Sequence, residues 1–183
     1  MTHAGWQMIE GYRPGLVGAC VRLHGVFYAA HAGFGAFFEG QVAAGMAEFL
    51  QRLHSSRNRI WSAWAGERML GCIAIDGEDL GRNAAHLRWF IVDADCRGAG
   101  IGKALIAAAL HFADGLGFEE TELWTFAGLD AARHLYERSG FRLREESIGR
   151  RWGVPVREQG FVRPKPHTPA YATTGVNAEE QQP

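Results

Sequence analysis

The sequence lacks the features that would tie it to a disulfide framework, a metal or a membrane. Its 183 residues include only 3 cysteines, Cys20, Cys72 and Cys96, and an odd number of distant cysteines favours reduced thiols in a cytoplasmic protein. No Cys/His cluster has zinc-site spacing, so we expect no metal. No apolar run is long enough to cross a bilayer, and Met1 to Gly5 does not resemble the start of a signal peptide.

An excess of charge of one sign is also missing. The chain has 19 Lys and Arg against 20 Asp and Glu, a formal net charge of −1. This balance supplies no basic field for nucleic acid or an anionic membrane, and we expect neither as a partner. Apolar residues make up 47% and charged residues 21%, as in ordinary globular proteins, and the length suits one domain.

The apolar periodicity predicts an α+β domain over residues 1–162, with helices packed on a mixed, mostly antiparallel sheet. Strands are expected at 6–12, 59–65, 69–76, 86–93, 121–126, 141–148 and 154–162, and helices at 16–30, 36–53, 103–115 and 131–138. Asp130 is expected to cap the last helix. Residues 163–183 are rich in Pro, Thr, Gly and Gln, which predicts a disordered tail.

The segment Arg97-Gly98-Ala99-Gly100-Ile101-Gly102-Lys103 joins a predicted buried strand to a predicted helix. A helix N-terminus presents N–H groups without intrahelical partners and a partial positive charge. Glycines let a phosphate approach those groups closely, and Arg97 adds a guanidinium suited to phosphate oxygens. The segment therefore predicts an anion site.

Three phosphate-loop patterns can be tested on this segment. The P-loop pattern fails because Arg97 stands at its first glycine and Ala104 at its hydroxyl position, and the dinucleotide pattern fails because Lys103 replaces its third glycine. The pattern [RQ]-x-x-G-x-[GA] fits as Arg97, Gly100 and Gly102. It is the pyrophosphate loop of the GNAT superfamily of acyl-CoA-dependent N-acyltransferases, which this chain resembles. A plain tight turn remains the alternative.

A second segment supports the same resemblance. Residues Ala131 to Phe141 are similar to the family's A-x-x-L-Y-x-x-x-G-F pattern, with Ala132, Leu135, Tyr136, Gly140 and Phe141 in register. Together with Leu123-Trp124-Thr125, they most resemble the acetyltransferase half of bacterial proteins that fuse a MarR-type winged helix to a GNAT domain. The sequence contains no winged-helix segment, so DNA binding does not carry over.

The resemblance implies the GNAT fold and acetyl-CoA as cosubstrate. The pyrophosphate would lie on Arg97 to Lys103, and the pantetheine arm between two strands that splay apart, pairing like an added strand. A backbone N–H near Ile91 or Val92 would hold the thioester carbonyl. The residues expected to contact acetyl-CoA are Phe90, Ile91, Val92, Arg97, Gly98, Ala99, Gly100, Ile101, Gly102, Lys103, Ala132 and Tyr136.

Catalysis of amine acetylation needs an acid and a base. Tyr136 matches the family's general acid, and a phenol with a pKa of about 10 holds a proton at neutral pH; a core tyrosine is the alternative. An amine with a pKa of about 10.4 must lose a proton before it attacks. Glu122 is the base we name as a site residue, while His86, Glu39 and His31 stay open.

The acceptor is expected to be a small-molecule or protein amine. Aromatic residues that suit an apolar or cationic amine are Tyr28, His31, Phe34, Phe37, Phe38, Trp89 and Trp124, although several fit a core equally well. Phe126 and Leu129 stand where many GNAT chains carry Asn. That departure motivates a second hypothesis, a binding module that senses acyl-CoA with little turnover. A homodimer is expected by analogy with the superfamily.

Overall fold

The computed structural model describes residues 2–3 and 5–166, which form one sheet covered by helices. The strand order is β1-β2-β3-β4-β5-β6-β8-β7. The strands are β1 (Thr2–His3), β2 (Trp6–Glu10), β3 (Asn58–Ala65), β4 (Arg68–Asp76), β5 (Ala84–Val92), β6 (Glu120–Phe126), β7 (Arg142–Gly149) and β8 (Val156–Pro164). The helices are α1 (Leu16–Ala32), α2 (Ala36–Gln51), α3 (Ile101–Gly115) and α4 (Asp130–Arg138). The predicted α+β fold is confirmed.

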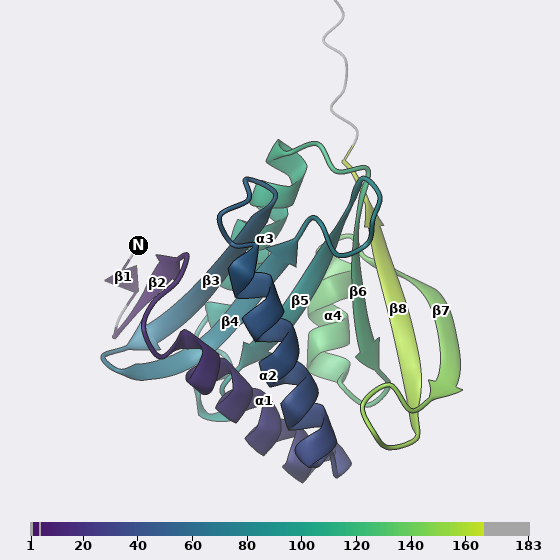
Figure 1. Ribbon diagram of the computed structural model, residues 1–183, viewed down its shortest axis with the longest axis horizontal. Helices are drawn as coiled ribbons and strands as arrows, with labels where there is room; N and C mark the ends of the chain where they lie inside the picture. Colours follow the sequence, from purple (N-terminus) through teal and green to yellow (C-terminus); the bar gives the residue numbers. More distant parts are fainter. Residues whose placement is uncertain (1, 4, 167–183) are drawn as a thin grey trace, which may run out of the picture.

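The sheet is sandwiched between two helical layers. Helices α1 and α2 cover one face and α3 and α4 the other (Figure 1). Apolar side chains recur along each helix at three and four residues, so each helix presents one stripe to the sheet. Fully buried members include Met46 and Phe49 on α2 and Leu105 and Ala109 on α3. Two cores result, one on each face, and they hold the intervening strands in place.

The sheet opens at its centre. Strands β5 and β6 form its parallel pair, and they pair only from Ala84 to His86 with Glu120 to Glu122. Beyond that point β5 continues on β4 and β6 continues on β8, so the two strands diverge. The C-terminal half of β5 therefore has a free edge, as expected from the family resemblance.

A bulge bends β5 inside the open part. Opposite Cys72 and Ala74 stand Ile91 and Arg88, so two residues of β5 face one residue of β4. Trp89 lies in the bulge with a φ of 49°, the single positive value among the described non-glycine residues. Bulges twist a strand and redirect its side chains. Around the bulge, Arg88, Trp89 and Phe90 border the opening.

Two details of the sequence prediction are wrong. Asp130 is not the cap of α4: Leu129 occupies the N-cap, without a side-chain hydrogen bond, and Asp130 lies in the first turn, where a negative charge favours the helix dipole. Arg163 belongs to β8, not to a tail, and its guanidinium donates to both carboxylate oxygens of Asp114 at 2.6 and 2.8 Å. Residues 167–183 of the predicted tail lie outside the described residues.

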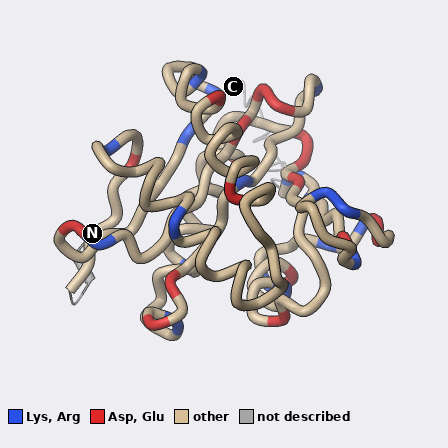
Figure 2. Tube along the Cα trace, turned by 60° about the horizontal axis from the view of Figure 1, so that its bottom comes forward, with Lys and Arg blue, Asp and Glu red and all other residues tan. Residues whose placement is uncertain are grey.

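The charged residues are interspersed along the fold rather than separated by sign (Figure 2). Many of them form ion pairs, such as Arg52 with Asp76 and Arg68 with Asp93. Among the described residues, no helix is long and apolar enough to span a bilayer.

Candidate active site

The opening between β5 and β6 leads into two adjoining cavities. The first, which we call the loop groove, has a volume of about 600 Å³ and lies between the 96–103 segment, α1 and α4. The second, the aromatic cavity, has a volume of about 420 Å³ and lies between α1, α2, β5, β6 and the β7–β8 loop. Every residue expected to contact acetyl-CoA lines the loop groove except Ala99.

The floor of the loop groove at one end is the N-terminus of α3. Gly100 is the N-cap, with a φ of 79°, and no side chain caps the helix. The N–H groups of the first turn are therefore available to a ligand, and the helix dipole favours an anion. Gly98 has a φ of 84°, and left-handed backbone at both positions explains why glycine is required there.

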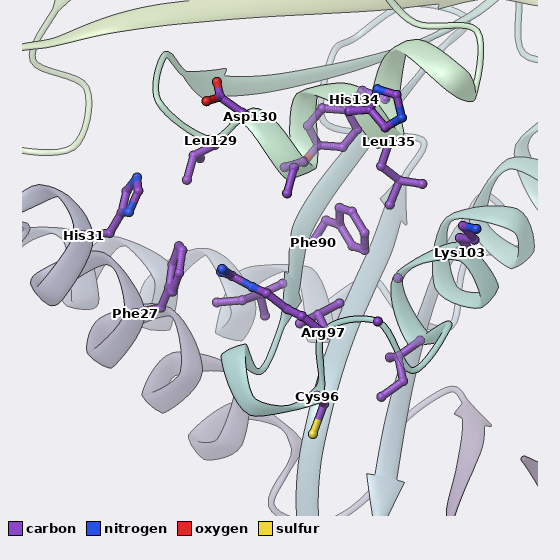
Figure 3. Close-up of a pocket in the computed structure, with 18 of the residues that line it drawn as sticks. Phe27, His31, Phe90, Cys96, Arg97, Lys103, Leu129, Asp130, His134 and Leu135 are labelled. Atoms are coloured by element: carbon purple, nitrogen blue, oxygen red, sulfur yellow. The ribbon is translucent and has the colours of Figure 1, made fainter. Parts of the chain in front are cut away.

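Two cations border this end of the groove, Arg97 and Lys103. Neither forms an ion pair with an acidic side chain in the described part of the chain. The Arg97 guanidinium instead extends toward α1 and lies over the Phe27 ring, 5.0 Å from its centroid (Figure 3). Uncompensated positive charge beside free N–H groups suits a phosphate ligand.

The middle of the loop groove is apolar. Phe27 and His31 approach from α1, and Leu129 and Leu135 from the α4 side (Figure 3). His31 donates from Nε2 to the Gly128 carbonyl at 3.2 Å and stacks on Phe27. His31 therefore bridges the two walls of this groove. His31 does not line the aromatic cavity, whereas a base for the acceptor amine would have to lie there.

The positions where the family often has Asn divide between the two cavities. Phe126 lines the aromatic cavity, with its ring 5.2 Å from that of Phe34 and 5.6 Å from that of Trp152. Leu129 faces the loop groove. No amide group therefore replaces the missing Asn at either position.

Three residues line both cavities: Tyr28, Phe90 and Tyr136. Burial raises the pKa of Tyr136 well above its ordinary value, and nearby Tyr28 raises it further. Burial raises the pKa of Tyr28 to about 12, against the opposing effect of Arg97. Both phenols are therefore protonated at neutral pH. No hydrogen bond joins the Tyr136 hydroxyl to another described residue, which leaves it free for a ligand.

Aromatic rings dominate the second cavity. The rings come from Tyr28, Phe34, Phe38, Trp89, Phe90, Trp124, Phe126, Tyr136 and Trp152. Most of the aromatic residues expected around the acceptor are therefore present. Two of them are absent: His31 lines the loop groove instead, and Phe37 is 60% exposed, lines neither cavity and lies against Gly153.

Of the four base candidates, His86 alone lines the aromatic cavity. Its Nδ1 donates to Asp79 Oδ2 at 2.5 Å. The hydrogen bond from His86 is the main cause that lowers the pKa of Asp79, and Arg88 contributes to the same shift. Because a carboxylate only accepts, Nδ1 carries a proton, and in the neutral form of the imidazole Nε2 is left as an acceptor. Glu39 instead packs against Gly25 of α1.

Glu122 is a poor base in this structure. It is 3% exposed, lines neither cavity, and pairs with Arg82 and with Arg144, the latter at 2.7 Å. Burial alone would raise the pKa of Glu122, but hydrogen bonds and charges of Arg144 and Arg82, with a contribution from Glu120, lower it to about 2. The carboxylate holds β6 to β7 rather than facing the opening.

The sequence did not point to Asp79 or Phe27. Asp79 lies in the irregular segment between β4 and β5, where no periodicity indicates direction. Phe27 has helical spacing that fits a core residue as well as a groove wall. Only the packing of α1 across the opening shows that Phe27 forms a wall of the groove.

The chain matches the model of the Acetyltransferase (GNAT) family over residues 27–141. It is 32% identical over 116 residues to N-acetyltransferase 8 of Mus musculus, covering 61% of this chain and 51% of that protein. It is 29% identical over 95 residues to the uncharacterized N-acetyltransferase YsnE of Bacillus subtilis, covering 51% and 62%. A mycothiol acetyltransferase of Propionibacterium freudenreichii matches over 39% of this chain and 23% of its own length, at 34% identity. The chain thus spans less than two thirds of these relatives.

Solved structures share the fold. The acetyltransferase yncA of Salmonella typhimurium, solved with acetyl-CoA, superposes with a TM-score of 0.69 at 11% identity, covering 91% of this chain and 97% of that one. The ribosomal-protein-S18-alanine N-acetyltransferase of Escherichia coli superposes with a TM-score of 0.64 at 16% identity, covering 95% and 100%. At such identities the likeness concerns the fold alone. With more than half of its length matched by the family model, this chain belongs to the GNAT acetyltransferase family.

Proposed function

We propose that the protein transfers the acetyl group of acetyl-CoA to a primary amine by direct attack in a ternary complex. The observation that carries this proposal is the meeting of two cavities at Tyr136. One cavity has the positive charge and free backbone donors that a pyrophosphate needs. The other has the aromatic walls and the His86 acceptor that an amine substrate needs.

The residues of the loop groove fit acetyl-CoA. Gly98 to Gly102 and the first turn of α3 would hold the pyrophosphate through backbone N–H groups, with Arg97 adding charge. The free edge of β5, near Phe90 to Val92, would pair with the amide arm and present an N–H to the acyl oxygen. Acetyl-CoA would supply an activated thioester at the opening.

His86 and Tyr136 would manage the protons. His86 Nε2 accepts the proton of the amine, and Asp79 holds the imidazole in the tautomer that allows this. The amine nitrogen then forms the bond to the acyl carbon as the carbon–sulfur bond breaks. Tyr136 donates its proton to the departing sulfur and recovers one from the attacking nitrogen, so an ammonium substrate gives up two protons, one to His86 and one by way of Tyr136 to the thiol.

A sensor of acyl-CoA with little turnover is the second candidate. The apolar side chains of Phe126 and Leu129, in place of an amide, favour it. The similarity to regulator-fused acetyltransferases stays a prediction, since the relatives named above carry acetyltransferase names alone. The homodimer and the tail likewise stay predictions.

Tyr136→Phe tests the proposal. The substitution keeps the ring in its packing and removes the hydroxyl, so acetyl-CoA affinity should change less than about 3-fold while kcat falls by about 10²- to 10⁴-fold, as for loss of a general acid. CoA thiol release with a panel of amines and acetyl-CoA titration calorimetry measure the two quantities. Tyr12→Phe, at an exposed tyrosine outside both cavities, is the matched control.

The outcomes separate the two candidates. Acetyl-CoA binding without thiol release for any amine would favour the sensor. If acetyl-CoA failed to bind or to raise the unfolding temperature, neither candidate would stand.

A further inference from the structure

The charged groups that face the aromatic cavity are cationic. Arg88 and Arg151 line it, and no Asp or Glu is among the described residues that do. The remaining polar lining consists of neutral or imidazole groups, such as Gln41 and Thr125. A cavity for a polyamine or another polycation needs carboxylates on its walls, and this one has none there.

Arg88 is committed to the protein. Its Nη1 lies 3.1 Å from Asp76 and 3.4 Å from Asp79, and its Nη2 lies against Gly45 of α2. Asp76 is fully buried, and the guanidinium also covers the Trp89 ring. The charge of Arg88 is therefore compensated, and the side chain acts as part of the wall.

Arg151 is held differently. Its backbone N–H donates to Glu158 Oε1 at 2.7 Å and its Nε to Glu158 Oε2 at 3.3 Å. Its Nη1 and Nη2 groups contact no acceptor in the described part of the chain. The guanidinium lies over the Trp124 ring, 3.8 Å from the centroid. Glu158 and Trp124 thus fix a fork whose outer donors remain available at the cavity.

We propose that the acceptor is a small aromatic amine that also carries a carboxylate, of the class of the aromatic amino acids. The carboxylate would bind the free Nη donors of Arg151, a geometry suited to a planar anion. The ring would pack among Phe34, Trp124 and Trp152, and the amine would face His86 and Tyr136. A cavity of about 420 Å³ falls within the range of about 300–1,000 Å³ typical of small-molecule sites. This inference rests on the proposed function.

Binding of matched acids and amines tests the inference. The probes are L-tryptophan, L-tyrosine and L-phenylalanine, each beside its decarboxylated amine and its amide, titrated by calorimetry into the protein saturated with CoA. Each acid should bind about 10- to 100-fold more tightly than its amine, as for one charged hydrogen-bonded pair. The amides control for amine basicity, since they keep the α-carbon framework but lack the anion.

Arg151→Gln should reduce the affinity for the acids by about 10-fold or more and leave that for the amines within about 2-fold. Arg150→Gln is the matched control, because Arg150 is an exposed neighbour that lines neither cavity. Equal binding of acids and amines, tighter binding of spermidine, or an Arg151→Gln protein that binds the acids normally would each overturn the inference. Because binding is measured, failure of the proposed acetyl transfer in the thiol-release assay would be seen separately.

Discussion

The loop groove and the aromatic cavity adjoin one another but are built in opposite ways. The groove owes its proposed anion site to one run of the chain, Arg97 to Lys103, whose donors are backbone groups and whose cations lack acidic partners among the described residues. The cavity draws its polar groups from several separate elements and its charges are mostly paired, as in His86 with Asp79 and Arg88 with Asp76. If the proposed function holds, donor recognition is a local property, whereas acceptor recognition depends on long-range packing.

The largest expected effect is on the cavity side. His86→Gln removes the proposed base while keeping a polar side chain, so kcat/KM should fall by about 10²-fold or more near pH 7. Activity of this variant should rise as pH increases, because more of the amine is then already deprotonated. A pH–rate profile measures this, with His111→Gln on the outer face of α3 as control.

Asp79→Asn should produce a smaller loss than His86→Gln, because it removes the partner that orients the imidazole rather than the base. Unchanged rates and pH dependence in both variants would mean that proton transfer does not use this pair.

The next largest expected effect is on acetyl-CoA binding in the loop groove. It can be tested by comparing the helix start in the groove with one outside it. Gly15 and Gly100 are the N-caps of α1 and α3, with φ values of 85° and 79°, and a Cβ at either meets nothing within 4 Å. Gly100→Asp and Gly15→Asp should therefore carry similar backbone strain and lower stability equally. Only Gly100→Asp places a carboxylate in the groove, and it should weaken acetyl-CoA binding by about 10- to 100-fold.

Titration calorimetry and urea unfolding of the two glycine variants give both quantities. Similar acetyl-CoA affinities for Gly15→Asp and Gly100→Asp would contradict the proposal that the pyrophosphate binds at the N-terminus of α3.

The smallest expected effect is a change in the pH dependence of stability. It distinguishes His24 of the aromatic cavity from His31 of the loop groove. Burial lowers the pKa of His24 to about 4, although its hydrogen bond to the Cys20 carbonyl opposes the shift. The unfolded state, with a pKa of about 6.5, therefore binds a proton first as pH falls, and stability is lost between about pH 6.5 and 4. From pH 7 to 5 this loss is about 2 kcal/mol, at about 1.36 kcal/mol per pKa unit.

His24→Gln should lose that part of the pH dependence, whereas His31→Gln, at an exposed histidine of the groove, should retain it. Urea unfolding at pH 7 and pH 5 measures the difference. Parallel pH dependence in the His24→Gln and wild-type proteins would show that His24 is not buried as a neutral side chain.

Local patterns were sufficient to predict much of the fold and the residues that meet in the loop groove. Periodicity predicted the strands and helices to within a few residues, and the glycine spacing together with Tyr136 predicted the loop groove. The predictions that the structure does not favour required knowledge of neighbours. Glu122 has the alternation of a residue beside the opening, but Arg82 and Arg144 occupy its carboxylate. Phe37 has helical spacing but points outward.

The sequence by itself predicted the anion site, because closely spaced glycines at the start of a helix leave the N–H groups of its first turn open to a ligand. Only the tertiary structure decided which polar groups line the aromatic cavity. Alternation says which face of a strand His86 occupies, but its partner Asp79 lies in an irregular segment whose course depends on packing. The free donors of Arg151 likewise depend on Glu158 and Trp124, which approach from other strands. When the partner of a charged side chain lies far away in the sequence, local sequence patterns do not show whether that charge is free to bind a ligand.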